Sequence, residues 1–200
     1  MAVIPFDTVL RSFDTCWNRQ RWEKLPYDGN RYEVIDGVLY MSTSPSLFHQ
    51  WISRRILFLL AAQVDDRGRG TTLYAPVGVF MPNCQPVAPD LFVVLTKDRA
   101  IMRDGSVEGV PALIVEILSP SHPELDLRTK REAYARAGVP EYWIVRPATR
   151  DVLVCCKPDA SLGDFAQANL VPADGVLQSP TLPFEATVAG FFAGAPDTTL

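Results

Sequence analysis

The sequence lacks the features that would place the protein in a membrane or in an oxidising compartment. No segment approaches the roughly 20 consecutive apolar residues of a membrane-spanning helix, since the longest apolar stretch with a helical pattern covers residues 56–62. The N-terminus has neither the basic start nor the apolar run of a signal peptide. The four cysteines form no CxxC motif, which disfavours a zinc site. We therefore expect a cytoplasmic protein with reduced thiols and no membrane contact.

An excess of positive charge is missing as well. Lysine and arginine together number 19 against 23 acidic residues, for a net charge of −4. This balance excludes a protein that coats nucleic acid or anionic lipid by bulk charge. It is compatible with a local basic surface beside a cleft.

Apolar residues, in contrast, are plentiful enough for one well-buried core. Of the 200 residues, 48% are hydrophobic, which excludes a wholly disordered chain. This length corresponds to one domain. We expect residues 1–200 to form a single domain, in which residues 1–26 are an N-terminal helical extension and residues 27–192 the core. The 17 prolines predict stiff, non-helical connections.

Periodicity and turn signals predict an α/β fold. Apolar residues spaced by three and four predict helices over about residues 6–17, 47–64 and 124–137, the last closed by Gly138. The Asp36-Gly37 pair between two apolar segments predicts a β-hairpin. Further strands are predicted at residues 71–75, 77–81, 91–95, 112–118, 141–145 and 151–156. Strands combined with two substantial helices form an α/β (or α+β) domain with a mixed sheet.

Two acidic residues lie at or within apolar strands. Asp90 directly precedes the strand at 91–95, and Glu116 lies inside the strand at 112–118. A buried carboxylate costs several kcal/mol unless a cation or metal compensates it. If the two strands are neighbours, both carboxylates reach one edge of the sheet and suit Mg²⁺ or Mn²⁺ better than Zn²⁺. The alternatives are a turn aspartate for Asp90 and a pair with a core arginine for Glu116.

Three polar residues share one face of the second predicted helix. Asp126, Lys130 and Tyr134 are spaced at i, i+4 and i+8. In isolation, they would form a surface ion pair worth a few tenths of a kcal/mol. Because the helix follows the strand of Glu116, it can instead direct Lys130 at the two acids. A lysine there can stabilise a phosphorane-like transition state or help to deprotonate an attacking water.

Six segments in a particular order resemble a known family. They are residues 31–37, Ser44-Pro45 with His49, Pro89-Asp90, residues 111–121, the Asp126, Lys130 and Tyr134 series, and residues 138–145. This order resembles the Uma-type family of restriction-endonuclease-like proteins, within the PD-(D/E)XK nuclease superfamily. The resemblance extends from about Tyr27 to Phe192 and implies a nuclease-like domain with a mixed central β-sheet flanked by helices.

The resemblance also assigns roles to the acidic residues. Asp90 matches the first metal-binding acid of the family and Glu116 the second, so both would bind Mg²⁺ or Mn²⁺. The superfamily pattern places a lysine two residues after the second acid, where this sequence has Leu118. Lys130 matches the lysine of the Uma-type pattern and would replace it. Glu33 matches an early acid that could contact a further metal ion or the water.

Substrate contacts follow from the same resemblance. His49 matches a histidine at the long helix, although a lone histidine is more often a packed or capping residue. Tyr134 shares the helix face of Lys130. Because the net charge is negative, DNA would be bound by local cations, with solvated surface charges as the alternative for each. The candidates are Arg54, Arg55, Arg67, Arg69, Arg128 and Arg131.

The leading hypothesis is a Mg²⁺-dependent endonuclease that hydrolyses DNA phosphodiester bonds. A homodimer is expected, because many such nucleases cut two strands. The alternative is a catalytically inactive nuclease fold that binds nucleic acid or a protein, which Leu118 favours. A hydrolase of another phosphate ester would use the same acids.

Overall fold

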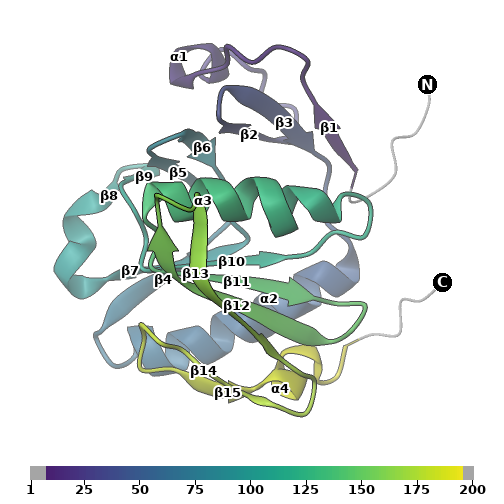
Figure 1. The fold of residues 1–200 in the computed structure, drawn as a ribbon, viewed down its shortest axis with the longest axis vertical. Coiled ribbons are helices and arrows are strands. Elements are labelled where there is room, and N and C mark those ends of the chain that lie inside the picture. The colour runs from purple at the N-terminus through teal and green to yellow at the C-terminus, as the bar shows by residue number, and fades with distance from the viewer. Residues whose placement is uncertain (1–7, 196–200) are drawn as a thin grey trace.

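The computed structural model of the chain describes residues 8–195, which form three β-sheets and several helices (Figure 1). The helices are α1 (Arg19–Trp22), α2 (Leu47–Leu60), α3 (Arg131–Ala137) and α4 (Val188–Phe192). The strands are β1 (Val9–Arg11), β2 (Arg31–Ile35), β3 (Val38–Ser42), β4 (Gly70–Tyr74), β5 (Gly78–Met81), β6 (Cys84–Val87), β7 (Leu91–Leu95), β8 (Met102–Arg103), β9 (Ser106–Glu108), β10 (Leu113–Ile117), β11 (Glu141–Arg146), β12 (Asp151–Asp159), β13 (Asp164–Val171), β14 (Val176–Gln178) and β15 (Glu185–Thr187).

Both long helices contain a π-helical turn. The segment Ala61–Asp65 extends α2, and the segment Leu125–Lys130 leads into α3. A 3-10 helix covers Thr96–Ile101. Gly138 ends α3 at a φ of 83°, a left-handed conformation that glycine adopts without steric cost. The two helices predicted over residues 47–64 and 124–137 are therefore confirmed.

The central sheet has six strands in the order β13-β12-β11-β10-β7-β4. Strands β10 and β11 are parallel, whereas β10 pairs with β7 in antiparallel fashion. Leu91 of β7 lies opposite Val115 of β10. The strand that follows Asp90 and the strand that contains Glu116 are thus neighbours, and the predicted mixed sheet is confirmed.

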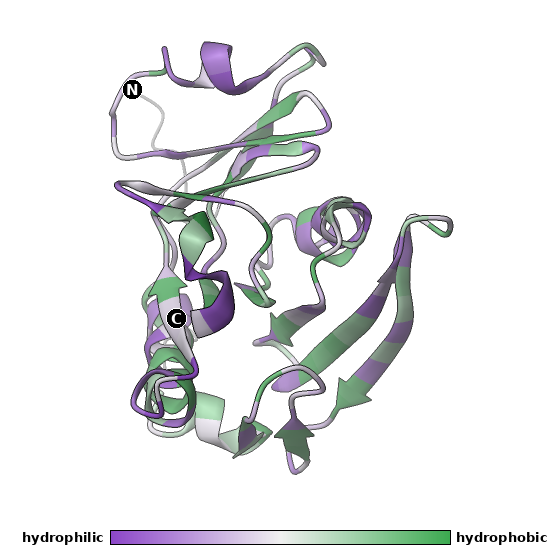
Figure 2. Ribbon diagram, turned by 90° about the vertical axis from the view of Figure 1, so that its left-hand side faces the viewer, coloured by the Kyte–Doolittle hydropathy of each residue, from purple (hydrophilic) through white to green (hydrophobic). Residues whose placement is uncertain are grey.

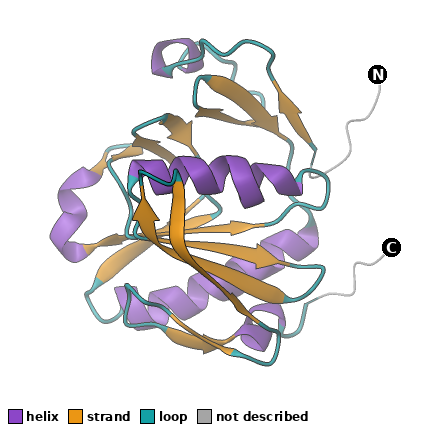
Figure 3. Ribbon diagram, in the orientation of Figure 1, coloured by secondary structure: helices purple, strands orange, loops and turns teal. Residues whose placement is uncertain are grey.

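Helices cover both faces of this sheet (Figure 3). Successive strand residues point to opposite faces, so Leu91 and Val115 pack with α2 while Phe92 and Ile114 pack with α3. Figure 2 shows the central strands as mostly hydrophobic and α1, at the top of the molecule, as hydrophilic. Glu116 lies on the face that α3 covers, because it alternates with Val115 along β10.

A second sheet of seven strands has the order β1-β3-β2-β6-β5-β9-β8. It contains the predicted hairpin, in which Asp36 and Gly37 connect β2 and β3 with φ values of 50° and 76°. These positive values match the right-handed twist of a hairpin. A Cβ atom at Gly37 would lie 2.3 Å from the carbonyl oxygen of Thr15, so the close approach requires glycine as well.

The helix predicted over residues 6–17 is wrong for the part that the structure describes. Val9–Arg11 forms β1, an edge strand that pairs with β3, with Val9 opposite Ser42. The four-residue α1 follows, capped by the Asn18 side chain. The apolar spacing did not indicate a buried helical face, because Phe13 is fully exposed, and pairing with β3 satisfies the backbone of Val9–Arg11 instead. Residues 6 and 7 lie outside the described part.

None of the helices within residues 8–195 is both long and apolar enough to cross a bilayer. All four cysteines are free thiols, and three of them are buried.

Sequence periodicity did not predict β13, whose residues are largely exposed.

Candidate active site

The two acids singled out from the sequence meet at one edge of the central sheet. The Ile117 amide donates a hydrogen bond to Asp90 Oδ2 at 2.8 Å. Glu116, the residue before Ile117, is buried with 1% of its surface exposed, and Asp90 with 6%. The antiparallel pairing of β7 and β10 creates this proximity, because it brings the start of one strand beside the end of the other.

Lys130 is directed at these acids and not at solvent. Its Nζ atom lies 2.8 Å from Glu116 Oε1, 3.2 Å from Glu33 Oε2 and 3.5 Å from Asp126 Oδ1. The Tyr134 hydroxyl donates to Glu116 Oε1 at 2.9 Å. The π-helical turn and α3 carry Asp126, Lys130 and Tyr134 on one face, as their spacing predicts.

Glu33 enters the site from the hairpin of the second sheet. Its Oε1 atom accepts a hydrogen bond from the Ala88 amide at 2.9 Å, two residues before Asp90. Its Oε2 atom lies close to Lys130 but accepts no hydrogen bond, although Glu33 is completely buried. Glu33 therefore retains acceptor capacity inside the site.

Two basic side chains hold Asp90. Arg31 Nη1 donates to Asp90 Oδ1 at 3.0 Å and to the Ala88 carbonyl at 3.2 Å. His49 Nε2, near the start of α2, lies 3.1 Å from Asp90 Oδ2. Arg31 was not among the predicted site residues. Its i, i+2 spacing to Glu33 places both side chains on one face of β2, but the pairing with Asp90 depends on the tertiary structure.

The acidic side chains of the site outnumber its basic ones. The acids are Glu33, Asp90, Glu116 and Asp126, and the basic residues are Lys130, Arg31 and His49. Burial raises the pKa of Glu116 to about 8, with the like charges of Asp90, Asp126 and Glu33 adding to the effect and Lys130 opposing it. Burial also raises the pKa of Asp126 to about 6. The site therefore carries more negative charge than its cations neutralise, which favours a bound proton or metal cation.

Asp90 and Lys130 are held in their charged forms. Burial alone would raise the pKa of Asp90, but His49, Arg31 and the Ile117 amide hold this pKa well below its usual range. Burial alone would lower the pKa of Lys130, but the carboxylates of Glu116, Glu33 and Asp126 raise it above its usual range. The site thus holds an ammonium at Lys130 and a carboxylate at Asp90, each stabilised by its own partners.

The two arginines predicted beside Lys130 lie apart from the acids. Arg128 is exposed and pairs with Glu132 at 3.3 Å. Arg131 forms two hydrogen bonds with Asp164 of β13, at 2.7 and 2.8 Å. The helix turns both side chains away from the face of Lys130, because neither is three or four residues from it.

The donor set fits a hard divalent cation. A small cavity of about 30 Å³ lies among Asp90, Glu116, Asp126 and Lys130. No three acidic, histidine or cysteine side chains within residues 8–195 are arranged to hold a metal ion together. Mg²⁺ commonly binds one or two carboxylates and completes its shell with water and substrate phosphate. Asp90 and Glu116 are two carboxylates of this kind that line the cavity.

A mixed sheet flanked by helices, with two acids and a lysine gathered at its edge, is the arrangement of a restriction-endonuclease-like fold. The sequence model of the Uma2 family, described as "Putative restriction endonuclease", matches residues 19–189. The chain belongs to this family, which confirms the resemblance seen in the sequence.

A solved structure shares the fold. The crystal structure described as that of a "putative nuclease belonging to DUF820 from Anabaena variabilis ATCC 29413" superposes with a TM-score of 0.74. The sequences are 16% identical, and the match covers 88% of this chain and 97% of the other. No curated protein sequence matches this chain significantly.

Proposed function

We propose that this protein is an endonuclease that hydrolyses DNA phosphodiester bonds with Mg²⁺ or Mn²⁺. The observation that carries the proposal is the contact of Lys130 Nζ with Glu116 Oε1 at 2.8 Å, beside the strand that positions Asp90. Leu118 occupies the superfamily lysine position, and Lys130 supplies an ammonium at the same acids from the following helix. Family membership supports a nuclease-like activity.

Asp90 and Glu116 would hold the metal ion. When bound, the ion polarises the phosphate and lowers the pKa of a coordinated water. Arg31 and His49 keep Asp90 ionised and oriented, and Tyr134 orients Glu116 through its hydroxyl. Both acids are thus positioned before substrate arrives.

Lys130 and Glu33 would act on the water and the phosphate. Because its pKa is raised, Lys130 is a cation and not a base, so it offsets the negative charge that develops on the phosphate. Glu33 Oε2 faces Lys130 without accepting a hydrogen bond, and it is available to accept one from the attacking water.

DNA would approach through local cations. Arg54 stacks over the ring of Trp51 at 4.3 Å on the outer side of α2, and Arg128 is exposed on the π-helical turn before α3. Arg131 can reach a phosphate only if it releases Asp164. Each such contact would make DNA affinity fall with salt.

We also propose that the protein is a cytoplasmic homodimer, because many nucleases of this kind use two sites to cut the two strands of DNA. Light scattering in the presence of DNA checks the dimer. A monomer bound to cleaved duplex would contradict it.

Plasmid nicking tests the activity. Wild type should cleave with Mg²⁺ or Mn²⁺, whereas Asp90→Ala, Glu116→Ala and Lys130→Met should each lose at least about 100-fold in rate. Lys97→Met, which removes an exposed lysine beyond the end of β7 opposite to Asp90, should cleave like wild type. Circular dichroism shows whether each variant is folded. Equal cleavage by wild type and folded Glu116→Ala would overturn the proposal.

The second candidate function is a catalytically inactive nuclease fold that binds nucleic acid or a protein. Leu118 favours it, as does the engagement of Lys130 with three carboxylates. Calorimetric titration with Mn²⁺ separates the two functions. An active site should bind the ion in wild type and lose it in Glu116→Ala, whereas an inactive fold should show no Glu116-dependent binding.

A further inference from the structure

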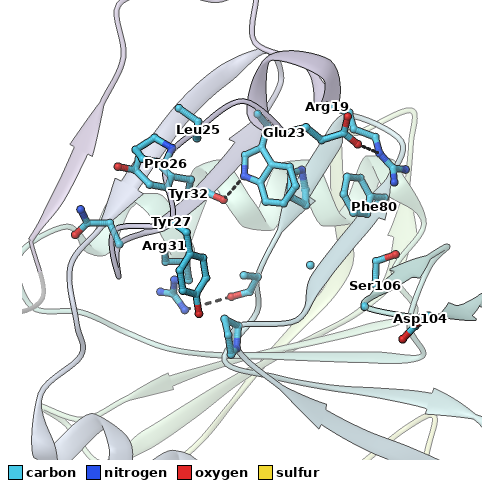
Figure 4. Close-up of a pocket in the computed structure, with 17 residues that line it drawn as sticks. Arg19, Glu23, Leu25, Pro26, Tyr27, Arg31, Tyr32, Phe80, Asp104 and Ser106 are labelled. Carbon is cyan, nitrogen blue, oxygen red and sulfur yellow. Dashed lines mark hydrogen bonds and ion pairs between the residues drawn. The ribbon is translucent and has the colours of Figure 1, made fainter.

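A second, larger cavity shares Arg31 with the cavity among the acids. It has a volume of about 460 Å³, within the range of roughly 300–1,000 Å³ typical of small-molecule pockets. Helix α1, the loop before β2, strand β5 and the turn between β8 and β9 enclose it (Figure 4). Arg31 lines this cavity and also donates to Asp90, so one side chain separates it from the candidate active site.

The walls of this pocket are rich in aromatic rings. Trp22 and Phe80 meet edge to face, with ring centroids 5.9 Å apart. The Trp22 indole nitrogen donates to the Tyr32 carbonyl at 3.0 Å, which fixes the indole in place. Tyr27 stands at the edge of the pocket and is fully exposed, so both faces of its ring contact solvent.

The two arginines of the pocket are neutralised by partners. Arg19 lies 4.0 Å above the Phe80 ring and pairs with Glu23 and Glu108. Arg31 pairs with Asp90. A phosphate would therefore find no free cation among these arginines, whereas a neutral planar ring would find the exposed ring of Tyr27. Asn30, Asp104 and Ser106 add polar groups to the lining, and these can hydrogen-bond the edge of such a ring.

We propose that this aromatic pocket, formed by Trp22, Tyr27, Tyr32 and Phe80, binds one unstacked nucleobase of the nucleic acid whose backbone lies at Asp90 and Glu116. The choice of nucleic acid as ligand rests on the proposed function. The position of Arg31, which lines the pocket and also contacts Asp90, supports a nucleotide as the ligand. A nucleotide carries a flat neutral base and an anionic phosphate a short distance apart. Base stacking on aromatic side chains tolerates any base and requires a single-stranded or extruded nucleotide.

Tyr27 allows a clean test, because its exposure means that substitutions there remove no packing. The probe is a short single-stranded oligonucleotide with one 2-aminopurine, bound without divalent metal so that cleavage plays no part. Tyr27→Ala should weaken binding roughly 5- to 150-fold, the range expected for loss of one stacked base. Tyr27→Phe should bind like wild type. Phe13→Ala is the matched control, since Phe13 is equally exposed and lies outside the pocket.

The fluorescence of 2-aminopurine reports stacking directly. It should be quenched on binding to wild type and to Tyr27→Phe, and less so on binding to Tyr27→Ala. Unchanged affinity in Tyr27→Ala, or a Tyr27→Phe variant as weak as Tyr27→Ala, would overturn the proposal. So would a Tyr27→Ala variant that changes self-association while its oligonucleotide affinity stays the same, because the pocket would then bind a second copy of the chain.

Failure of this inference differs from failure of the proposed function. Metal-dependent cleavage that Glu116→Ala abolishes, together with unchanged binding by Tyr27→Ala, would overturn only the base pocket. Oligonucleotide binding that depends on Tyr27, in a protein that cleaves no DNA with any divalent metal, would support the proposed base pocket and overturn the catalytic proposal.

Discussion

The Lys130 ammonium and the Glu116 carboxylate are both almost completely removed from water. Each would be strongly destabilising without the other, since breaking a buried ion pair costs about 3–5 kcal/mol. The surplus of acids around Lys130 means that the pair is not balanced, and burial together with like charge raises the pKa of Glu116. The same surplus provides the attraction for a divalent cation.

This imbalance predicts how stability depends on pH. Folded Glu116 and Asp126 titrate near about 8 and about 6, above their values in an unfolded chain, so the folded protein binds more protons than the unfolded one. The free energy of unfolding of the metal-free protein should therefore fall as pH rises from about 4.5 to about 8. The lowered pKa of Asp90 and the raised pKa of Lys130 lie outside this window and add no slope.

Urea denaturation in a chelator, at several pH values across this window, measures the slope. Glu116→Gln should reduce the slope, because the amide does not titrate and only Asp126 still does. Glu132→Gln, at a more exposed position, should leave the slope unchanged. A Glu116→Gln variant with the wild-type slope would contradict the assignment of the proton to this site.

Strand β11 begins with another buried carboxylate, which accepts hydrogen bonds from a segment near the C-terminus. Glu141 is completely buried and accepts hydrogen bonds from the Trp143 indole at 2.5 Å and the Ser179 hydroxyl at 2.6 Å. Thr181 also donates to it, through its amide at 3.2 Å and through its hydroxyl. The carboxylate thus anchors the segment that places Phe184 against Trp143 in the core.

Replacement of Glu141 should detach that segment. Glu141→Ala leaves several buried donors without an acceptor and should lower the free energy of unfolding by about 2–4 kcal/mol. Glu141→Gln keeps one carbonyl acceptor and should cost less than Glu141→Ala. Chemical denaturation checks both, with the exposed Glu124→Ala expected within about 0.5 kcal/mol of wild type. Equal stability of Glu141→Ala and wild type would contradict the anchoring role.

At the scale of the whole molecule, the two large sheets share one core. Tyr40 and Val79 of the seven-stranded sheet belong to the same buried cluster as Phe92 and Ile114 of the six-stranded sheet. Tyr134 of α3 packs in that cluster as well. Neither sheet can therefore lose its packing without exposing the apolar face of the other.

This shared core predicts a single cooperative unfolding transition, as expected for one domain. Tryptophan fluorescence, far-ultraviolet circular dichroism and calorimetry should give coincident midpoints. Two separated transitions, or a protease-resistant fragment containing only one sheet, would show instead that residues 8–195 form more than one domain.

Elements whose signals are local could be predicted from the sequence. Asp36-Gly37 indicated the hairpin because both positions require positive φ, and Gly138 indicated the end of α3 for the same reason. The helical spacing placed Lys130 and Tyr134 on one face, and the apolar run around Glu116 predicted a strand buried on both sides. Such features follow from backbone sterics and periodicity within a few residues.

Which of these residues contact one another depends on the packing of elements that are distant in the sequence. Arg31 contacts Asp90 across 59 positions and Arg131 contacts Asp164 across 33, and neither pairing has a local sequence signature. The conformation of Val9–Arg11 was likewise decided by a partner, because pairing with β3 replaced the predicted helix. Strand register and sheet order determine such contacts, so the acids and Lys130 could be predicted from the sequence, whereas the pairing of Arg31 with Asp90 could not.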